Sequence, residues 1–214
     1  MAHTLILGTT ESGKTTCAIM LAKFQRVNGF GTLGLDPMSD PKWSLDFKTK
    51  KVDEFLHVFW RSKRCHCFID EAGKSVGQFD SVMQETATEG RHWGHSCYFI
   101  SQRGVQIART VRDQCSHLFL FNTSLEDSKT HANEWNQPEL KTAYTLPQGT
   151  YFYATRFGKL QRNVLFTPRG VDHDRTPDNV IRRGDHSAGT LDAESSVAES
   201  DDETPSARDS VAAD

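Results

Sequence analysis

Residues 5–21 read LILGTTESGKTTCAIML, an apolar run followed by a glycine-framed loop, a lysine and a helical pattern. Gly8, Gly13, Lys14 and Thr15 fit the spacing G-x-x-x-x-G-K-[S/T], and the match falls where it must, after a predicted strand and at the start of a predicted helix. The glycines let the backbone turn so that successive N–H groups point into the loop and form, with the helix N-terminus, a nest for an anion. The stretch therefore predicts a site for the phosphates of a nucleoside triphosphate.

The spacing also assigns roles to side chains. Lys14 is expected to reach the β- and γ-phosphates, and the Thr15 hydroxyl is expected to ligate Mg²⁺. The competing interpretation is a glycine turn that caps an ordinary helix. The residues expected to bind the nucleotide are Gly8, Thr9, Thr10, Glu11, Ser12, Gly13, Lys14, Thr15 and Thr16.

The chain of 214 residues is long enough for one α/β domain with a small appendage. Its first residues lack the basic flank and apolar stretch of a secretory signal, and no later run approaches the ~20 apolar residues of a membrane span. The five cysteines are scattered through apolar stretches, which favours reduced, buried thiols over a disulfide framework. We therefore expect a soluble, intracellular protein.

Residues 184–214 differ in composition from the rest of the chain. They contain nine acidic residues and one arginine, a formal charge of −8, whereas residues 1–183 carry +5. Such a segment cannot bury enough apolar surface to offset the entropy of ordering it. The predicted organisation is a folded domain over residues 1–170, a linker over 171–183 and a disordered acidic tail over 184–214. The tail is equally compatible with a docking peptide, a solubilising segment and a mimic that keeps DNA away.

Short apolar runs of strand length alternate with longer helical patterns. This alternation predicts an α/β fold with a mainly parallel central sheet flanked by helices. Two aromatic and apolar runs around a glycine, in residues 150–167, predict a β-hairpin packed on the sheet edge. The predicted strands are 3–8, 31–36, 66–72, 97–102 and 117–122, and the predicted helices are 14–27, 52–62, 79–91, 105–115 and 124–135.

Polar residues end two of the predicted strands. Asp70 closes the apolar run in CFIDEA, where a carboxylate that faces the site can hold the Mg²⁺ shell. Glu71 can orient a water for attack on the γ-phosphate, which a kinase that must exclude water does not need. The alternative for this pair is a solvated strand end. Gln102, in CYFISQR, lies where ligands bind in open α/β sheets and can sense the γ-phosphate or hold the attacking water.

Taken in chain order, GTTESGKT, FIDEA and FISQR resemble the motifs of the FtsK/HerA superfamily of ring-forming, DNA-pumping ATPases. The chain looks most similar to the genome-packaging ATPases of membrane-containing, tectivirus-like bacterial viruses, through LGLDP, GRHWG, VRDQCSHLFLF and LPQGTYFYA. The resemblance covers about residues 3–167. It implies a P-loop NTPase of the ASCE, RecA-like class that hydrolyses ATP with Mg²⁺ and forms a homo-oligomeric ring, with a hexamer as the expected state.

In such a ring, each ATP site receives an arginine from the neighbouring subunit, which is worth ~10³- to 10⁵-fold in rate. The resemblance favours Arg91 in GRHWG for this role, then Arg103, and after them Arg109 and Arg112. The alternative for Arg91 is that it caps a helix C-terminus. Asp36, at the tip of the second predicted strand, either approaches the nucleotide or belongs to an ordinary turn.

The predicted function is an ATP-hydrolysing ring motor that translocates double-stranded DNA and packages a viral genome into a procapsid. The expected location is the host cytoplasm, with attachment to the virion packaging vertex and a portal or vertex protein as a possible further partner. The viral origin rests on the resemblance. Two alternatives stay open: a small-molecule or nucleoside kinase, and a nucleotide-gated assembly protein that does not hydrolyse ATP.

Three further patterns are less specific. Zinc binding by CHC (65–67) is disfavoured because both thiols share one face of a strand and no C-x-x-C partner follows. The aromatic residues of 151–157 are expected in the core rather than stacked on bases. Basic residues between the second and third strands are expected on a solvated face or, in a ring, along its channel. They are Lys42, Lys48, Lys50, Lys51, Arg61, Lys63 and Arg64.

Overall fold

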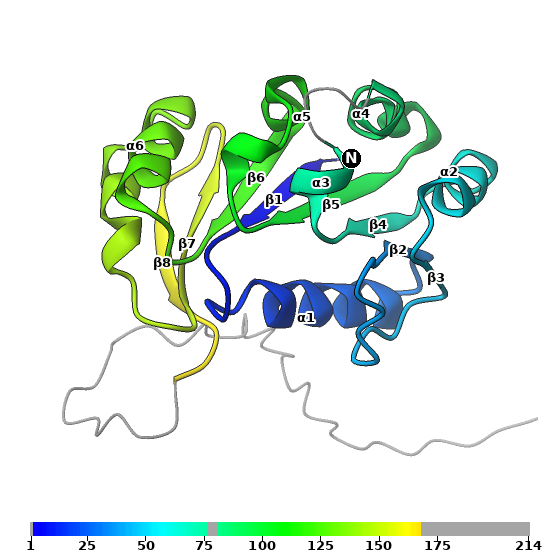
Figure 1. Ribbon diagram of the computed structural model, residues 1–214, viewed down its shortest axis with the longest axis horizontal. Helices are drawn as coiled ribbons and strands as arrows, with labels where there is room; N and C mark the ends of the chain where they lie inside the picture. Colours follow the sequence, from blue (N-terminus) through cyan, green and yellow to red (C-terminus); the bar gives the residue numbers. More distant parts are fainter. Residues whose placement is uncertain (1, 77–80, 168–214) are drawn as a thin grey trace, which may run out of the picture. The chain divides into compact units, whose positions relative to one another are not determined.

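The computed structural model describes residues 2–76 and 81–167. Within them, an eight-stranded sheet runs in the order β3-β2-β4-β5-β1-β6-β7-β8 (Figure 1). The strands from β3 to β6 in this order pair in parallel, and β7 and β8 add to the edge as an antiparallel hairpin. The predicted α/β fold and its closing hairpin are confirmed. The predicted linker and acidic tail lie outside the described residues.

The strands are β1 (His3–Leu7), β2 (Thr32–Leu35), β3 (Phe47–Thr49), β4 (His66–Ile69), β5 (Ser96–Ser101), β6 (Cys115–Leu120), β7 (Thr150–Thr155) and β8 (Gln161–Val164). The helices are α1 (Lys14–Val27), α2 (Val52–Arg61), α3 (Ala72–Ser75), α4 (Ser81–Thr88), α5 (Arg109–Gln114) and α6 (Leu125–Glu134), with 3₁₀ turns η1 (Gly90–Trp93), η2 (Gly104–Gln106) and η3 (Pro138–Thr145). Among the described residues, no helix combines the length and apolar character needed to cross a bilayer.

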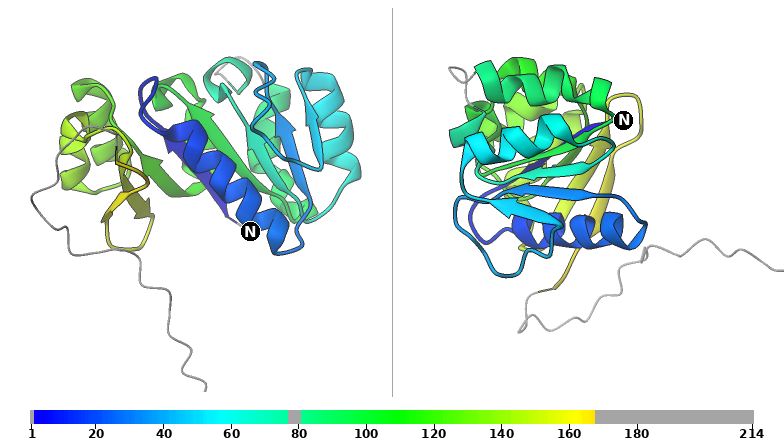
Figure 2. Two further views of the ribbon diagram at one scale, coloured as in Figure 1. Left: turned by 90° about the horizontal axis from the view of Figure 1, so that it is seen from below. Right: turned by 90° about the vertical axis from the view of Figure 1, so that its right-hand side faces the viewer.

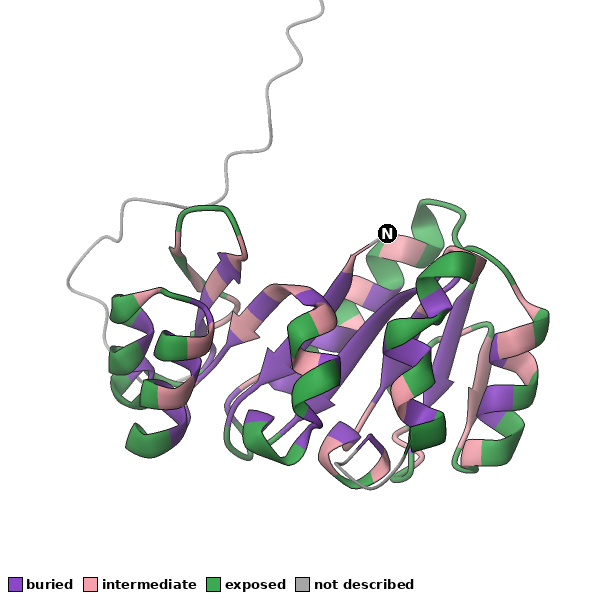
Figure 3. Ribbon diagram, turned by 90° about the horizontal axis from the view of Figure 1, so that it is seen from above, coloured by how far each residue is buried: buried purple, intermediate pink, exposed green. Residues whose placement is uncertain are grey.

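A hydrophobic cluster lies on each face of the sheet, because successive strand residues point to opposite faces. Ile6 joins the cluster that packs on α1 through Cys17 and Ala18. Leu5 and Leu7 join the larger cluster, which packs on α2, α4, α5 and α6. Figure 2 shows α1 alone across one face, and Figure 3 shows buried residues concentrated on the central strands. Helices on both faces explain why the central strands are apolar along their whole length.

The strand order brings the ends of three strands to one edge. β5 pairs with β1 on one side and with β4 on the other, all in parallel. Parallel strands end at the same edge, so the residues that follow β1, β5 and β4 leave the sheet together. These residues are Gly8, Gln102 and Asp70. The candidate site therefore assembles at this edge.

Several predicted boundaries are wrong where distant contacts decide the backbone. The helix predicted over 105–115 is instead η2 followed by α5, because the Ala108 N–H donates to the Val76 carbonyl rather than within a helix. The strand predicted over 66–72 ends at Ile69, and Glu71 takes a left-handed conformation before α3. In the helix predicted over 79–91, α4 ends at Thr88 and η1 follows. The short, half-buried edge strand β3 has no apolar run that would predict it.

Candidate nucleotide-binding site

The loop between β1 and α1 has a backbone that requires glycine at two positions. Gly8 and Gly13 have φ angles of +154° and +116°. A Cβ on Gly8 would lie 2.6 Å from the Cβ of Phe121, and one on Gly13 would lie 3.0 Å from the ring of the same residue. Both glycines of the predicted motif are therefore explained by conformation and close packing together.

Neighbouring segments hold the loop from outside. The Thr9 N–H donates to the carbonyl of Asn122 at 2.7 Å. The Glu11 carbonyl accepts from the Gln148 side chain at 2.9 Å, and the Ser12 carbonyl accepts from the Gly149 N–H at 3.0 Å. These contacts hold the loop in one shape from its outer side, as a preformed anion nest requires.

Lys14 is buried at the first position of α1, and its Nζ donates to the Thr9 carbonyl across the loop at 2.9 Å. Burial lowers the pKa of Lys14, and the negative charges of Asp70 and Glu71 oppose that shift. The buried hydroxyl of Ser12 has no hydrogen-bond partner among the described residues. A buried ammonium with a single carbonyl partner and an unpartnered hydroxyl suit a bound phosphate group, so the residues present fit a nucleotide.

Asp70 follows β4 and accepts a hydrogen bond from the Glu71 N–H at 2.9 Å. Burial raises the pKa of the Asp70 carboxyl, and the charges of Glu71 and Asp36 add to this, while Lys14 opposes it. A half-buried, charge-crowded carboxylate of this kind suits a divalent cation such as Mg²⁺, for which Thr15 at the start of α1 is the other expected ligand. The Glu71 carboxylate lies 3.4 Å from the exposed ammonium of Lys74.

Asp36 follows β2 and shapes its own turn. Its carboxylate accepts from the Met38 N–H at 3.1 Å and lies 3.5 Å from the Lys48 ammonium. These contacts fit the turn interpretation, and the pairing of Leu35 with Ile69 places Asp36 beside the candidate metal ligand Asp70 as well. The Lys48 ammonium also donates to the Asp40 carbonyl at 2.7 Å, so Lys48 is held against this turn rather than on a solvated face.

Gln102 is exposed directly after β5, in a pocket of about 630 Å³ beside the phosphate loop. The pocket brings the loop and the C-terminal ends of β5 and β6 together. Its lining residues are Thr9, Thr10, Gln102, Arg103, Thr123, Ser124, Glu126 and Asp127. The predicted sensor and the first residues of the loop thus share one cavity.

The candidate arginines lie in different surroundings. Arg91 lies in η1, before β5, and so at the opposite edge of the parallel sheet from the phosphate loop. It lies in the last turn of that 3₁₀ helix, and its guanidinium makes no hydrogen bond or ion pair with another described residue. Arg103 pairs with Asp127, Arg109 with Asp113 and Arg112 with Glu134.

The surroundings of Arg91 are basic. A pocket of about 540 Å³ is lined by Lys63, Arg64, Arg91, His92, Trp93 and Gly94. The side chains of Lys63 and Arg64, like that of Arg91, form no ion pair within residues 2–76 and 81–167. This edge of the sheet therefore presents three uncompensated cations away from the chain's own phosphate loop.

Sequence patterns did not identify the residues that hold the site from behind. These residues lie just after β6 and in the turn before β7, and they are Asn122, Gln148 and Gly149. The only signal was LPQG, which formed part of the resemblance. The five cysteines are free and buried as expected, and no cluster of potential metal ligands with three or more His, Cys, Asp or Glu occurs in the described part of the chain.

The loop after β1, the carboxylates after β4 and the inserted strand β5 define the fold of a P-loop NTPase. The sequence matches no protein-family model and no curated protein. Among solved structures, the genome packaging NTPase B204 from Sulfolobus turreted icosahedral virus 2, in complex with AMPPCP, is similar with a TM-score of 0.67 and 14% identity, over 78% of this chain and 98% of that chain.

Two further similar structures come from bacteria. VirB4 of Thermoanaerobacter pseudethanolicus has a TM-score of 0.61 at 11% identity, over 78% of this chain and 90% of that chain. The cytoplasmic domain of the Thermomonospora curvata type VII secretion ATPase EccC has a TM-score of 0.52 at 15% identity, over 80% of this chain and 26% of that chain. At these identities the likeness is one of fold.

Proposed function

We propose that this chain is an ATPase subunit of a homo-oligomeric ring, expected to be a hexamer, that translocates double-stranded DNA during viral genome packaging. The similarity in fold to a viral genome packaging NTPase supports the packaging role. In this proposal the ring works in the host cytoplasm and docks on a portal or vertex protein of the procapsid.

One observation carries the shared-site part of the proposal. The phosphate loop, the Asp70–Glu71 pair and Gln102 gather at one edge of the sheet, whereas the unpaired Arg91 lies at the opposite edge. Among the described residues, the arginine nearest this assembly, Arg103, is tied to Asp127. Within the part of the chain that the structure describes, the site therefore has no available guanidinium of its own. A second copy of the chain is needed to supply one.

The proposed chemistry follows from the placement of the side chains. When ATP binds, the Lys14 ammonium donates to the β- and γ-phosphates in place of the Thr9 carbonyl. As the oxygen of the attacking water bonds to the γ-phosphorus, Glu71 accepts a proton from that water. The bond between the γ-phosphorus and the ADP oxygen breaks. Gln102 holds that water or senses the γ-phosphate. Mg²⁺, when bound by Thr15 and Asp70, neutralises charge on the phosphates.

The test is complementation between two inactive variants. Glu71→Gln and Arg91→Ala are each expected to reduce steady-state ATP hydrolysis, by ~10³-fold or more for the arginine. In a mixture, some sites combine an intact Glu71 with an intact Arg91 from the neighbour, so turnover returns. Arg162→Ala, on the exposed face of β8, serves as the control and should retain full activity.

A mixture that stays inactive would contradict the shared site. Phosphorylation of a supplied acceptor, without hydrolysis that DNA stimulates, would indicate the kinase alternative. Tight ATP binding by the wild type without turnover would indicate the assembly-protein alternative.

A further inference from the structure

Arg103, the residue after the predicted sensor, is engaged within its own chain. Its Nε and Nη2 atoms donate to the two carboxylate oxygens of Asp127 at 2.9 and 3.0 Å. The Arg103 side chain is 55% exposed, but that of Asp127 is only 3% exposed. A two-point contact of this kind fixes orientation as well as distance.

Asp127 is itself held by the start of α6. The Ser124 hydroxyl caps the helix by accepting from the Asp127 N–H at 3.1 Å. The hydrogen bond from Arg103 lowers the pKa of Asp127, so its carboxylate is charged at neutral pH. If Arg103 left, a nearly buried charge would remain unpaired, which is unfavourable because that carboxylate cannot be fully hydrated in its place. That cost opposes a swing of Arg103 toward another subunit.

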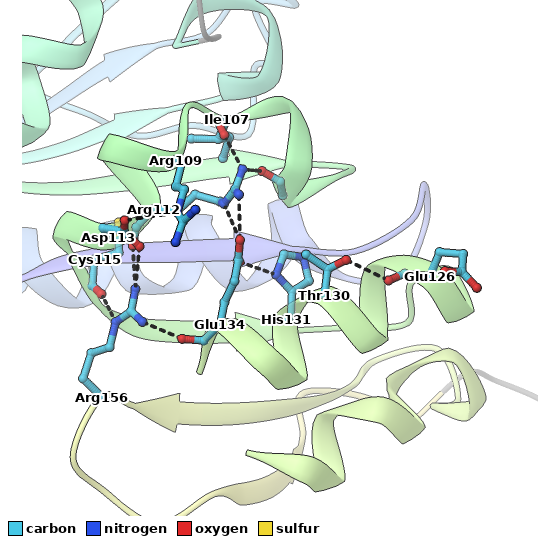
Figure 4. A network of polar contacts seen from close by, with 11 residues as sticks. Ile107, Arg109, Arg112, Asp113, Cys115, Glu126, Thr130, His131, Glu134 and Arg156 are labelled. Atoms are coloured by element: carbon cyan, nitrogen blue, oxygen red, sulfur yellow. Dashed lines mark hydrogen bonds and ion pairs between the residues drawn. The ribbon is translucent and has the colours of Figure 1, made fainter. Parts of the chain in front are cut away.

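The backbone after Gln102 is held at further points. The Ser101 hydroxyl donates to the Arg103 carbonyl at 3.1 Å. Arg112 donates to the carbonyls of Gly104 and Ile107 at 3.2 and 2.6 Å, as Figure 4 shows for Ile107. A Cβ on Gly104 would lie 2.4 Å from the His131 ring, so this segment rests directly on α6.

We propose that Arg103 is a positioning residue that acts in its own subunit, where its contact with Asp127 sets the place of Gln102 against Thr9 and Thr10. The three positions line the same pocket, and α6 supplies the fixed wall. The inference rests on the proposed ATPase function and assigns Arg103 a role in cis, distinct from that of Arg91 in trans.

The first test uses complementation again. Arg103→Ala is expected to lower kcat by up to ~10²-fold, the order expected for a misplaced group, with KM for ATP nearly unchanged. Mixed with Glu71→Gln it should not regain turnover, because no subunit then carries both residues. Restored turnover, as expected for Arg91→Ala, would overturn the inference.

Further variants separate positioning from a general loss of structure. Asp127→Asn should lower kcat as Arg103→Ala does, the double variant should be no worse than either, and Arg103→Lys should recover part of the loss. Lys129→Ala removes an exposed pair with Glu126 on the same helix and should leave kcat unchanged. An Asp127→Asn protein with wild-type kcat would overturn the inference.

A second readout does not depend on turnover. Hydrogen exchange of the amides in residues 102–107 should become at least ~10-fold faster in Asp127→Asn and stay unchanged in Lys129→Ala, because the pair no longer holds the segment. Unchanged hydrogen exchange in Asp127→Asn would overturn the positioning role of Arg103 and leave the proposed ATPase function standing. A wild-type protein without ATP turnover overturns the proposed function, and with it the effect of Arg103 on turnover.

Discussion

The side-chain amide of Gln148 donates a hydrogen bond to the backbone carbonyl of Glu11, 137 residues earlier in the chain, at 2.9 Å. Glu11 has a left-handed φ of 62°, so its peptide group needs an external partner to stay in place. The next carbonyl of the loop, that of Ser12, is held by the Gly149 N–H. The turn before β7 thus shapes the phosphate loop through its backbone carbonyls.

Gln148→Ala is therefore expected to weaken nucleotide binding. Loss of one hydrogen bond worth ~1 kcal/mol raises the Kd about fivefold, while kcat at saturating ATP stays near the wild-type value. Titration with a fluorescent ATP analogue measures the change. Gln137→Ala is the matched control, because Gln137 makes the same type of bond to the Gly158 carbonyl at the far end of the hairpin. Equal Kd values for the two variants would contradict the role of Gln148.

Asp70→Asn should stabilise the nucleotide-free protein while abolishing hydrolysis. Burial raises the pKa of Asp70 in the folded chain above the unfolded value of 3.8. The protonated Asp70 carboxyl therefore favours the folded chain over its charged form. This contribution to the free energy of unfolding is fully present below pH 3.8 and is lost as the pH rises through the folded pKa. The gain in melting temperature of Asp70→Asn over the wild type should grow from acid to neutral pH.

Thermal unfolding at several pH values tests this expectation, with the exposed Asp53→Asn as the control. A melting temperature below that of the wild type at pH 7 would show that the Asp70 carboxylate is net stabilising in the empty site.

Arg112 and Arg109 lie on the same short helix but differ in burial. The Arg112 side chain is 11% exposed and donates to Glu134 at 2.6 and 3.1 Å, whereas that of Arg109 is 84% exposed (Figure 4). Removing one partner of a mostly buried pair leaves the other charge uncompensated, so Arg112→Met should lower the free energy of unfolding by about 3 kcal/mol. Arg109→Met should change it by less than ~0.5 kcal/mol. Urea unfolding curves compare the two, and equal losses would be inconsistent with this distinction.

The parts of the fold that sequence patterns predict well are those set by neighbouring residues. The glycine-lysine loop and the helical pattern after it predict α1 with both of its ends, and the apolar runs predict β1, β5 and β6 closely. The site residues of the loop follow from the same local pattern. Their proposed chemical roles stay predictions.

The features that the sequence does not predict depend on partners far away in the chain. The contact of Gln148 with Glu11 and the pairing of Arg103 with Asp127 arise only when the sheet brings the segments together. The predicted helix is interrupted before α5 for the same reason, because the Ala108 N–H donates a hydrogen bond to the distant carbonyl of Val76. No local propensity encodes such contacts.

The central claim is that ATP is hydrolysed at sites shared between subunits and coupled to DNA. The most direct measurement is steady-state ATP turnover per subunit by the full chain across a series of protein concentrations, with and without double-stranded DNA. If the sites are shared, turnover per subunit climbs with protein concentration and rises further with DNA. Turnover that is independent of concentration and indifferent to DNA would contradict this claim.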